Sequence, residues 1–472
     1  MSQNLRLKQP YREREQVQAS FADKLAGVVG SKWVITDPAV LACYARDASV
    51  AFGHPAAAVL PGDTAEVSAV LRLCHEAGVP VTPRGAGTGL AGGAVPREGV
   101  VLALTRLRHL VVHKEDFLAV AGAGAVTGDI QAAAEAVGLF YPPDPASASV
   151  STIGGNVATN AGGPHGYKYG VTRNYLLGLE VVLADGTVIQ TGGRTLKNAT
   201  GYDLTALLCG SEGTLGVVTQ AILRLIPFPE ERAGVLAAFN DIGAAAQSVL
   251  DIVSTGTVPA ALEIMDRTAL ECAAWELRGK SPEAVLFIEL DGPRETVSRQ
   301  ISEVAGICRR SAAGDVQTAA GTGIEDFYRL RRSVSAALVR LYPVKIGEDV
   351  AVPVSQVWGF IRKITKITET TGLKIAVFGH AADGNLHPNI LFDPRETDAR
   401  QVEAATAAVF EAALACGGTL SGEHGIGSLK APYFQDAVGA KAAEIMRGIK
   451  RVFDPGGVLN PGKIWVLDGE QK

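Results

Sequence analysis

The chain has 472 residues, with 44 Lys and Arg against 49 Asp and Glu, and a formal net charge of −5. This balance argues against a nucleic-acid partner, because phosphate binding needs clustered Lys and Arg and no such block occurs. The length favours two domains over one core. Residues 1–16 are polar and no run of about 18 apolar residues occurs, so we expect neither a signal peptide nor a transmembrane segment.

The six cysteines are scattered and form no Cys-x-x-Cys pair. This spacing excludes an iron–sulfur or zinc-ribbon cluster held by this chain alone. We therefore expect free thiols in a reducing compartment. The predicted location is the cytoplasm, with peripheral attachment to the inner membrane only through partners.

The first predicted elements lie in residues 1–54, which read as a polar arm followed by short helices. One of these helices is expected to start at Asp37-Pro38. A strand follows, then a helix that begins at Thr64 and is capped by Gly78, then a second strand. Further along, Asp185-Gly186 lies between two β-rich runs and predicts a hairpin.

The region from 55 to 230 is expected to end in a strand near Pro227, after which the composition shifts. Ala-rich helices alternate with short strands from about residue 230 to 353. Asp383-Gly384 marks the tip of a second hairpin, and residues 399–418 predict a helix. The order is mixed α+β and not a regular βαβ series, so we expect an α+β fold.

Residues 87–92 read Gly-Thr-Gly-Leu-Ala-Gly, which matches the G-x-G-x-x-G dinucleotide fingerprint. A Rossmann loop also needs a helix at the third glycine and an acidic residue about 20 positions later. Two glycines and Pro96 disfavour that helix, and the nearest acidic pair follows a loop. We expect either an ordinary turn or a nest of backbone N–H groups that binds a pyrophosphate, with Arg84 and Thr88 nearby.

Two further glycine-rich stretches change this balance. Residues 142–163 combine small residues with two asparagines in what reads as one irregular loop, and residues 209–219 are of the same kind. Such loops have few side chains to bury, so their backbone is expected to lie against something flat and large. Three of them in one region favour an extended cofactor.

Six motifs occur in order: PRGAGTGLAGG, DPASASVSTIGGNVATNAGG, KNATGYDLTALLCGSEGTLGVVT, FGHAADGNLHPN, SGEHGIG and DPGGVLNPGKI. Together they resemble the FAD-linked subunit of glycolate oxidase and the D-lactate and D-2-hydroxyglutarate dehydrogenases, within the p-cresol methylhydroxylase/vanillyl-alcohol oxidase superfamily. The resemblance spans about residues 44–463. It implies an FAD-binding domain at 55–230 and a cap domain at 231–472, whose last ~50 residues return to the flavin.

The resemblance also assigns cofactor contacts. The residues that resemble FAD-binding positions are Arg84, Gly85, Gly87, Thr88, Gly89, Leu90, Asp144, Ser149, Ile153, Gly154, Gly155, Asn156, Ala158, Glu212, Gly213, Val218 and Asn460. Some members of the superfamily attach FAD through a His or Cys in the first loop. This loop contains neither, so non-covalent FAD is expected.

The predicted hairpin brings His380 and His387 together, and strand alternation puts His387 and Asn389 on one face. Two imidazoles and a carboxylate suit a divalent cation, whereas an isolated histidine is more often a surface or core residue. Through the resemblance, His380, His387 and Glu423 are expected to bind zinc or manganese, with His424 as base. Many relatives read H-A-G-D-G-N, whereas this chain has Ala381-Ala382.

The resemblance further implies that Arg331, Ser335, Lys345, Asn389 and His424 contact the substrate. The i,i+4 spacing of Arg331 and Ser335 puts both on one side of a helix. The alternative for this basic helix is a solvated face.

The expected reaction is the oxidation of a D-2-hydroxy acid to a 2-oxo acid, with hydride transfer to flavin N5, and with Arg331 and His424 as catalytic residues. A transferase like alkyl-dihydroxyacetone-phosphate synthase, and a non-catalytic flavin subunit, are the alternatives. Electrons are expected to leave to an iron–sulfur subunit, an electron-transfer flavoprotein, a quinone or a cytochrome. A hetero-complex and a homodimer both fit.

Overall fold

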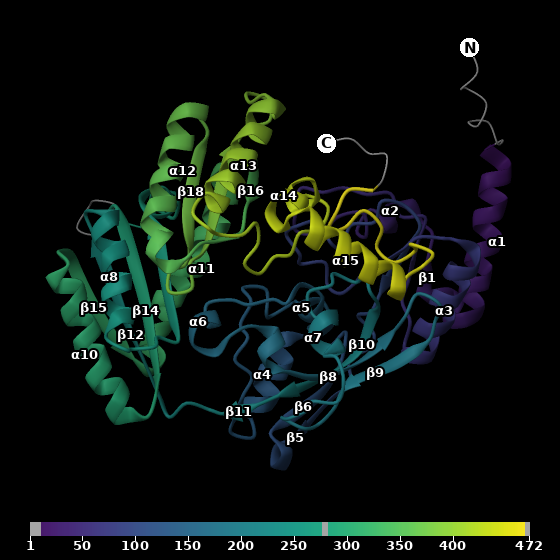
Figure 1. Cartoon of the computed structure of the whole chain (residues 1–472), viewed down its shortest axis with the longest axis horizontal. Coiled ribbons are helices and arrows are strands. Elements are labelled where there is room, and N and C mark those ends of the chain that lie inside the picture. The colour runs from purple at the N-terminus through teal and green to yellow at the C-terminus, as the bar shows by residue number, and fades with distance from the viewer. Residues whose placement is uncertain (1–10, 276–281, 468–472) are drawn as a thin grey trace.

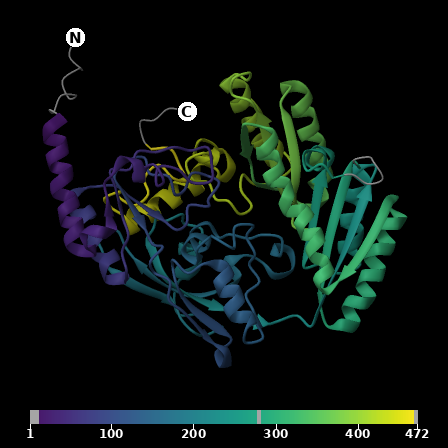
Figure 2. The same cartoon turned by 180° about the vertical axis from the view of Figure 1, so that it is seen from behind.

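The computed structural model describes residues 11–275 and 282–467, so the predicted polar arm at 1–10 lies outside the described residues. Two lobes face each other (Figure 1). The amino-terminal half and the carboxyl-terminal segment form one lobe, and the middle of the chain forms the other. Both views place the yellow carboxyl-terminal helices over the blue part of the first lobe (Figure 2).

The first sheet of the amino-terminal lobe has the order β1 (Val34–Ile35), β2 (Ala57–Val59), β4 (Val100–Ala103), β3 (Val81–Arg84). Helices α1 (Tyr11–Val29) and α3 (Thr64–Ala77) cover it, with Leu25 and Leu71 fully buried in the shared core. The expectation of short helices here is wrong for α1, which has 19 residues.

The predicted start and end signals of the helices in this region are confirmed. Helix α2 (Pro38–Leu41) begins after Asp37, whose carboxylate accepts hydrogen bonds from two backbone N–H groups of the first turn. Helix α3 starts at Thr64 and ends at Gly78, whose φ of 63° is the left-handed conformation that glycine adopts without strain. No helix follows the G-x-G-x-x-G stretch, in agreement with the rejection of a Rossmann loop.

The second sheet is antiparallel, with the order β5 (Leu110–His113), β6 (Leu118–Gly122), β10 (Val217–Arg224), β8 (Leu176–Val182), β9 (Val188–Gly192). The hairpin predicted across Asp185-Gly186 joins β8 and β9. The predicted strand near Pro227 is confirmed by β10 and β11 (Ile226–Pro227), which pairs with β7 (Leu139–Phe140). The short helices of this lobe are α4 (Thr127–Glu135), α5 (Ile153–Thr159), α6 (Gly166–Tyr169) and α7 (Leu204–Leu208).

Helix α5 corrects one expectation, because residues 142–163 were predicted to be wholly irregular. Its first two N–H groups, from Ile153 and Gly154, donate to the carbonyls of Ala125 and Ala123, so the open end of the helix is satisfied by a neighbouring segment. A Cβ on Gly154 would lie 2.7 Å from the Cβ of Ala123. The glycine therefore permits close approach of the helix and does not mark a loop.

The cap is built on an antiparallel sheet with the order β15-β12-β14-β13-β18-β19-β16, and β17 also pairs with β19. The strand bounds are β12 (Glu231–Phe239), β13 (Ala261–Asp266), β14 (Ala284–Gly292), β15 (Ala313–Ala320), β16 (Val344–Gly347), β17 (Val350–Ala351), β18 (Lys374–His380) and β19 (Asn385–Phe392). The predicted hairpin at Asp383-Gly384 joins β18 and β19.

The two faces of this sheet differ in chemistry. One face carries aliphatic residues that pack against α8 (Ile242–Ser254), α10 (Arg294–Arg310), α12 (Val357–Thr371) and α13 (Ala399–Leu414). The other face carries α9 (Arg267–Cys272) and α11 (Ile324–Leu341), and α11 lies on the side of the amino-terminal lobe (Figures 1 and 2). The face that carries α11 also bears buried charged residues.

The carboxyl-terminal segment returns to the amino-terminal lobe through α14 (Phe434–Val438) and α15 (Ala440–Phe453). Ile449 and Phe453 pack on the core of the second sheet, and Leu459 forms a parallel bridge with Val81 at the edge of the first. Lys450 Nζ donates to the carbonyls of Thr214 and Leu459, which fixes the end of α15. Within the described residues no helix is long and apolar enough to cross a membrane.

Candidate active site

A cavity lies in the amino-terminal lobe and is walled mainly by the backbone of the three glycine-rich stretches. Residues of the EHGIG motif close one side of it. The predicted cofactor residues on its wall are Arg84, Gly85, Gly87, Thr88, Gly89, Leu90, Gly154, Gly155, Asn156, Ala158, Glu212, Gly213 and Val218. The structure thus brings together three segments that lie far apart in the sequence.

Four predicted cofactor residues lie outside the cavity wall. Ile153 is fully buried in the core of the second sheet, and Ser149 is exposed. Asp144 lies behind the wall, where its carbonyl is 2.0 Å from the Cβ position of Gly163. Asn460 donates from Nδ2 to the carbonyls of Gly93 and Glu212, so it clamps two wall segments together.

The glycines of the cavity wall show that it suits a flat ligand. A Cβ on Gly89 or Gly155 would meet no atom nearer than 3.7 Å and 3.5 Å, respectively, so a side chain at either position makes only ordinary van der Waals contact with the protein. The Oγ1 atom of Thr152, also on the wall, is buried without a hydrogen-bond partner in the described chain. A shallow wall of backbone with a free hydroxyl fits an extended nucleotide cofactor.

Arg84, predicted to supply a cation for the pyrophosphate, also makes hydrogen bonds to the backbone of neighbouring segments. Its guanidinium donates to the carbonyls of Arg46, Ala94 and Cys43, with the contact to Arg46 at 2.7 Å. Burial lowers the pKa of this group, and the negative charge of Asp47 opposes the shift. Arg84 therefore holds the loop in place, while its body lines the cavity.

Glu212 ties the EHGIG motif to the cavity. Its carboxylate accepts hydrogen bonds of 2.8 Å from the backbone N–H groups of Ile426 and Gly427. Burial raises the pKa of Glu212, and these two donors oppose the rise. Its φ of 53° is unusual for a residue with a side chain. Glu212 thus positions the segment that carries Glu423 and His424.

The predicted metal ligands come together in one group, of which Glu423 also lines this cavity. His380 ends β18, His387 lies on β19, and Glu423 approaches from the EHGIG motif. Nε2 of His380 is 3.4 Å and Nε2 of His387 is 3.5 Å from the same Glu423 oxygen, Oε1. At metal–ligand distances of about 2.0–2.1 Å, the ligand atoms of a tetrahedral site lie roughly 3.4 Å apart. The donor set therefore fits zinc or a similar cation, with a position left for another ligand.

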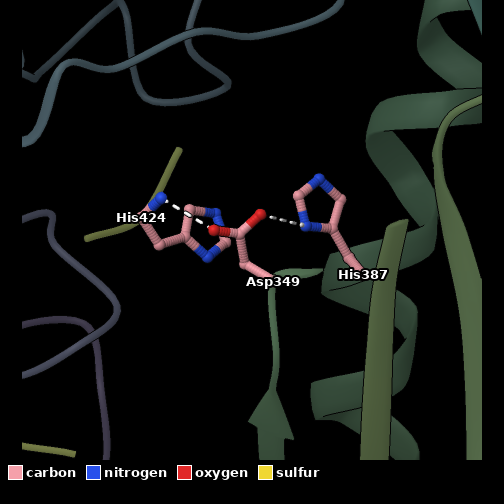
Figure 3. A group of neighbouring side chains, drawn as sticks. All are labelled: Asp349, His387 and His424. Atoms are coloured by element: carbon pink, nitrogen blue, oxygen red, sulfur yellow. Dashed lines mark hydrogen bonds and ion pairs between the residues drawn. The ribbon is translucent and has the colours of Figure 1, made fainter. Parts of the chain in front are cut away.

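Asp349, which follows β16, organises this group. Its Oδ2 accepts from Ser421 Oγ and from the backbone N–H groups of Glu423 and His424, at 2.7, 3.0 and 2.9 Å. Its Oδ1 lies 3.7 Å from His387 Nδ1 (Figure 3). Asp349, His387 and His424 also satisfy the distances of a metal site. Because its oxygens already accept several hydrogen bonds, we assign Asp349 a structural role, which is to hold the segment that carries Glu423 and His424.

Electrostatics agree with cation binding at His380, His387 and Glu423. Burial lowers the pKa of His387 to about 3, with His424 adding to the effect, so its lone pair is available at neutral pH. Burial opposes charge on Glu423, but contacts with His380 outweigh it and bring the pKa to about 2. Burial also opposes charge on His380, yet Glu263 raises the pKa of that imidazole. A cation would replace this proton.

The predicted substrate residues lie on the same face of the cap sheet. Arg331, on α11, donates from Nε to Glu263, and its guanidinium lies 4.5 Å from the ring centroid of Phe378. Lys345 Nζ donates to Ser335 Oγ at 2.8 Å, and burial lowers the pKa of Lys345. Asn389 donates from Nδ2 to the carbonyl of His387 at 2.6 Å. It therefore supports the strand that carries a candidate metal ligand.

Two acidic residues of this site were missed by sequence reasoning. Glu263 is fully buried on β13 and contacts both His380 Nδ1 and Arg331 Nε. Asp349 is equally buried. The available signal was a lone carboxylate inside an apolar run, as in Ala-Leu-Glu-Ile-Met, since an unpaired charge is almost never placed in a core.

Comparisons with known proteins agree with this architecture. Residues 55–192 match the family model of an FAD binding domain. Residues 228–464 match the family model described as "FAD linked oxidases, C-terminal domain". The glycolate oxidase subunit GlcD of Bacillus subtilis (strain 168) is 44% identical over 439 residues, covering 91% of this chain and 93% of that protein. A D-lactate dehydrogenase of Archaeoglobus fulgidus is 36% identical, covering 86% and 90%.

Solved structures show the same fold at low sequence identity. A p-cresol methylhydroxylase with substrate bound superposes with a TM-score of 0.80 at 18% identity, covering 97% of this chain and 98% of that one. An alkyldihydroxyacetonephosphate synthase reaches 0.74 at 18% identity, covering 94% and 84%. These likenesses confirm the predicted α+β fold of the p-cresol methylhydroxylase type.

A glycine-walled cofactor cavity beneath a charged cap face defines the class of an FAD-dependent oxidoreductase. Within that class, the chain belongs to the FAD-linked oxidase family that includes glycolate oxidase GlcD subunits and D-lactate dehydrogenases. The expected cofactor, FAD, and the expected family are thereby confirmed.

Proposed function

We propose that this protein oxidises a D-2-hydroxy acid to the 2-oxo acid at a cation-assisted site above non-covalently bound FAD. The observation that carries the proposal is the convergence of His380, His387, Glu423 and Arg331 on one face of the cap, while Glu423 and His424 also line the cofactor cavity. The names of the relatives, a glycolate oxidase subunit and a D-lactate dehydrogenase, support the same substrate class.

The residues divide the binding of such an acid between them. Arg331 is bonded only through Nε among the described residues, so its two Nη groups are available for a carboxylate in a bidentate pair. Lys345 and Ser335 add donors on the next turn and strand. When bound, the cation polarises the hydroxyl group and FAD accepts the hydride. His380, His387 and Glu423 would hold that cation.

His424 is the proposed base. Its Nε2 lies 4.0 Å from Glu423 Oε1, within reach of a hydroxyl group held at the predicted cation site. Its backbone N–H is fixed by Asp349, and its ring stacks on His387 with centroids 5.1 Å apart. The imidazole of His424, in its neutral form, accepts the hydroxyl proton at Nε2.

Electrons must then leave the flavin to a separate acceptor. The six cysteines form no Cys-x-x-Cys pair, and none of them belongs to a group of candidate metal ligands in the part of the chain that the structure describes. We propose an iron–sulfur subunit, an electron-transfer flavoprotein, a quinone or a cytochrome as acceptor. GlcD is named as a subunit of glycolate oxidase, which supports a hetero-complex over a homodimer.

The test is anaerobic mixing of the purified yellow protein with D and L forms of lactate and 2-hydroxyglutarate, and with glycolate. We expect rapid bleaching of the flavin absorbance and one equivalent of 2-oxo acid from the D forms or glycolate. If none bleaches the flavin, the oxidation proposal is wrong. Conversion of an acyl-dihydroxyacetone phosphate without net redox change would then support a transferase like the synthase that shares the fold.

A further inference from the structure

One buried carboxylate connects the two halves of the candidate substrate site. Glu263 lies on β13, where it pairs in register with His380 of β18, and its side chain is wholly buried. Oε1 accepts from His380 Nδ1, and Oε2 accepts from Arg331 Nε. A single side chain therefore contacts both a predicted metal ligand and the predicted carboxylate-binding cation.

The contact with His380 decides which ring nitrogen faces the site. A carboxylate at Nδ1 keeps a proton there, so the lone pair of a neutral imidazole resides on Nε2. Nε2 is the atom that lies 3.4 Å from Glu423 Oε1, on the side of the other candidate ligands. Glu263 thus fixes the tautomer and the ring orientation that cation binding needs.

The contact with Arg331 fixes the plane of its guanidinium. Glu263 holds Nε from one side, and the ring of Phe378 lies under the group at 4.5 Å. With these two restraints, the Nη edge has one orientation relative to His380. The distance between the guanidinium and the cation site is therefore set by one carboxylate.

Stability alone gives little reason for a charge at this position. Replacing a buried ion pair or triad by well-packed apolar residues is often neutral or stabilising, so such a group is weak evidence for a stabilising role. A fixed spacing, in contrast, is needed by a ligand whose carboxylate and hydroxyl sit on adjacent carbons. Both partners of Glu263 contact the same carboxylate on one face of the cap sheet.

We propose that Glu263 is a positioning residue that couples the cation site to Arg331 and so measures the spacing between the carboxylate and the hydroxyl group of the substrate. This inference rests on the proposed function. Glu263 does not line the cofactor cavity, so its removal is expected to leave flavin binding intact. Its loss changes cation affinity and substrate affinity together.

The first variant is Glu263→Gln. Its amide offers one acceptor and one NH2 donor, and Arg331 Nε is a permanent donor. The oxygen therefore goes to Arg331 and the NH2 group faces His380, which forces the imidazole proton to Nε2. Titration of metal-free protein with Zn²⁺ or Mn²⁺ is expected to show affinity about 10–100-fold weaker than wild type.

The substrate arm uses the concentration dependence of flavin bleaching. Glu263→Gln is expected to raise the apparent dissociation constant of the hydroxy acid, whereas Arg331→Met raises it without weakening the metal. Glu263→Asp is shorter by one methylene and cannot contact both partners, so it also weakens at least one ligand. It serves as the second variant if Glu263→Gln does not fold.

The matched control is Glu289→Gln. Glu289 is an equally buried carboxylate on the same sheet face, paired with Arg232 and not with His380 or Arg331. The Glu289→Gln variant is expected to be less stable than wild type but to keep wild-type metal affinity. Metal affinity of Glu263→Gln within twofold of wild type, or a wild-type protein that takes up neither cation, overturns the proposal. If wild-type flavin is reduced by no hydroxy acid, the proposed function fails, while the metal titration still decides the role of Glu263.

Discussion

The cofactor cavity and the cap face are lined by different chemical groups. The cavity wall is mostly backbone, glycine and small side chains, and two of its charged members, Arg84 and Glu212, hold loops together. The cap face carries long charged side chains buried in a sheet, each paired with another. A broad planar cofactor is bound mainly through the shape of the wall, whereas a small acid is bound by a few charged side chains. Substitutions in the two regions should therefore fail in different ways.

The largest effect is expected where the two regions meet. His424→Ala should leave folded, yellow protein, because Nδ1 of the imidazole has no hydrogen-bond partner and Nε2 lies 4.0 Å from Glu423 Oε1 among the described residues. The rate of flavin reduction should fall by about 10²–10⁴-fold, as for loss of a general base. Rapid mixing measures this rate, and His54→Ala, at an exposed position, is the control. An unchanged rate removes His424 from the role of base.

The second effect tests the buried charges of the cap for stability. Glu289 is fully buried and contacts Arg232, His165 and Tyr328, so it joins the two lobes. Glu289→Ala leaves these partners without their carboxylate and should lower the free energy of unfolding by about 3–5 kcal/mol. Denaturant unfolding measures this loss. Glu325→Gln, which breaks an exposed pair, should cost no more than about 1 kcal/mol.

Glu289 should also make the stability of the folded protein depend on pH. Burial opposes charge on Glu289, but contacts with His165 and Arg232 outweigh it and lower the pKa to about 2. Because the folded pKa lies below the unfolded value of about 4.3, this stabilisation is present above that pH and is lost as pH falls toward 2. The wild-type unfolding temperature should therefore drop more steeply below pH 4.3 than that of Glu289→Gln. Parallel curves for the two proteins contradict this assignment.

A smaller effect is expected in the cavity wall. Gly89 lines the cavity, and a Cβ there meets Asp47 Oδ2 at an ordinary contact distance of 3.7 Å. Gly89→Val should therefore fold normally but retain FAD about 10–100-fold less tightly, a loss of roughly 1.4–2.7 kcal/mol in binding. The flavin-to-protein absorbance ratio after gel filtration measures retention. Gly193→Val, at a position where a Cβ meets no atom within 4 Å and which does not line the cofactor cavity, should stay yellow. Full flavin content in Gly89→Val would mean that the cofactor lies elsewhere.

The smallest effect concerns the hairpin tip that differs from many relatives. Ala382→Gly adds backbone freedom to the unfolded chain and should destabilise the protein by about 0.4–1 kcal/mol. Ala382 is buried beside the turn and contributes no ligand atom to the metal group. Calorimetric unfolding and metal titration should thus show a slightly lower unfolding temperature and an unchanged metal affinity. A tenfold change in metal affinity would show that the turn shapes the ligand set.

Local signals in the sequence predicted many elements because each has its own chemistry. Asp37 and Gly78 bound helices as expected, and Asp383-Gly384 closes the predicted hairpin. Helix α5 was missed because its stability depends on hydrogen bonds to Ala123 and Ala125, which are far away in the chain. Tertiary contacts outweigh the low helix propensity of glycine there.

The candidate site divides in the same way. His380, His387 and Glu423 stand in short motifs with a recognisable ligand chemistry, and the fold brings them together. Glu263 and Asp349 stand in no such motif, since their importance comes from strand pairing and loop contacts that a single sequence does not display. The hydrogen bonds of Arg84 could not be predicted for the same reason, because its acceptors are carbonyls of separate segments.

The central claim, that the cap holds a cation which helps a hydroxy acid to reduce the flavin below, is tested most directly by one anaerobic measurement. Flavin bleaching by D-lactate is followed in protein as purified, after removal of metal by a chelator, and after return of Zn²⁺ or Mn²⁺. The account predicts fast bleaching, a loss of at least about tenfold in rate without metal, and recovery on its return. Equal rates in all three samples would contradict it.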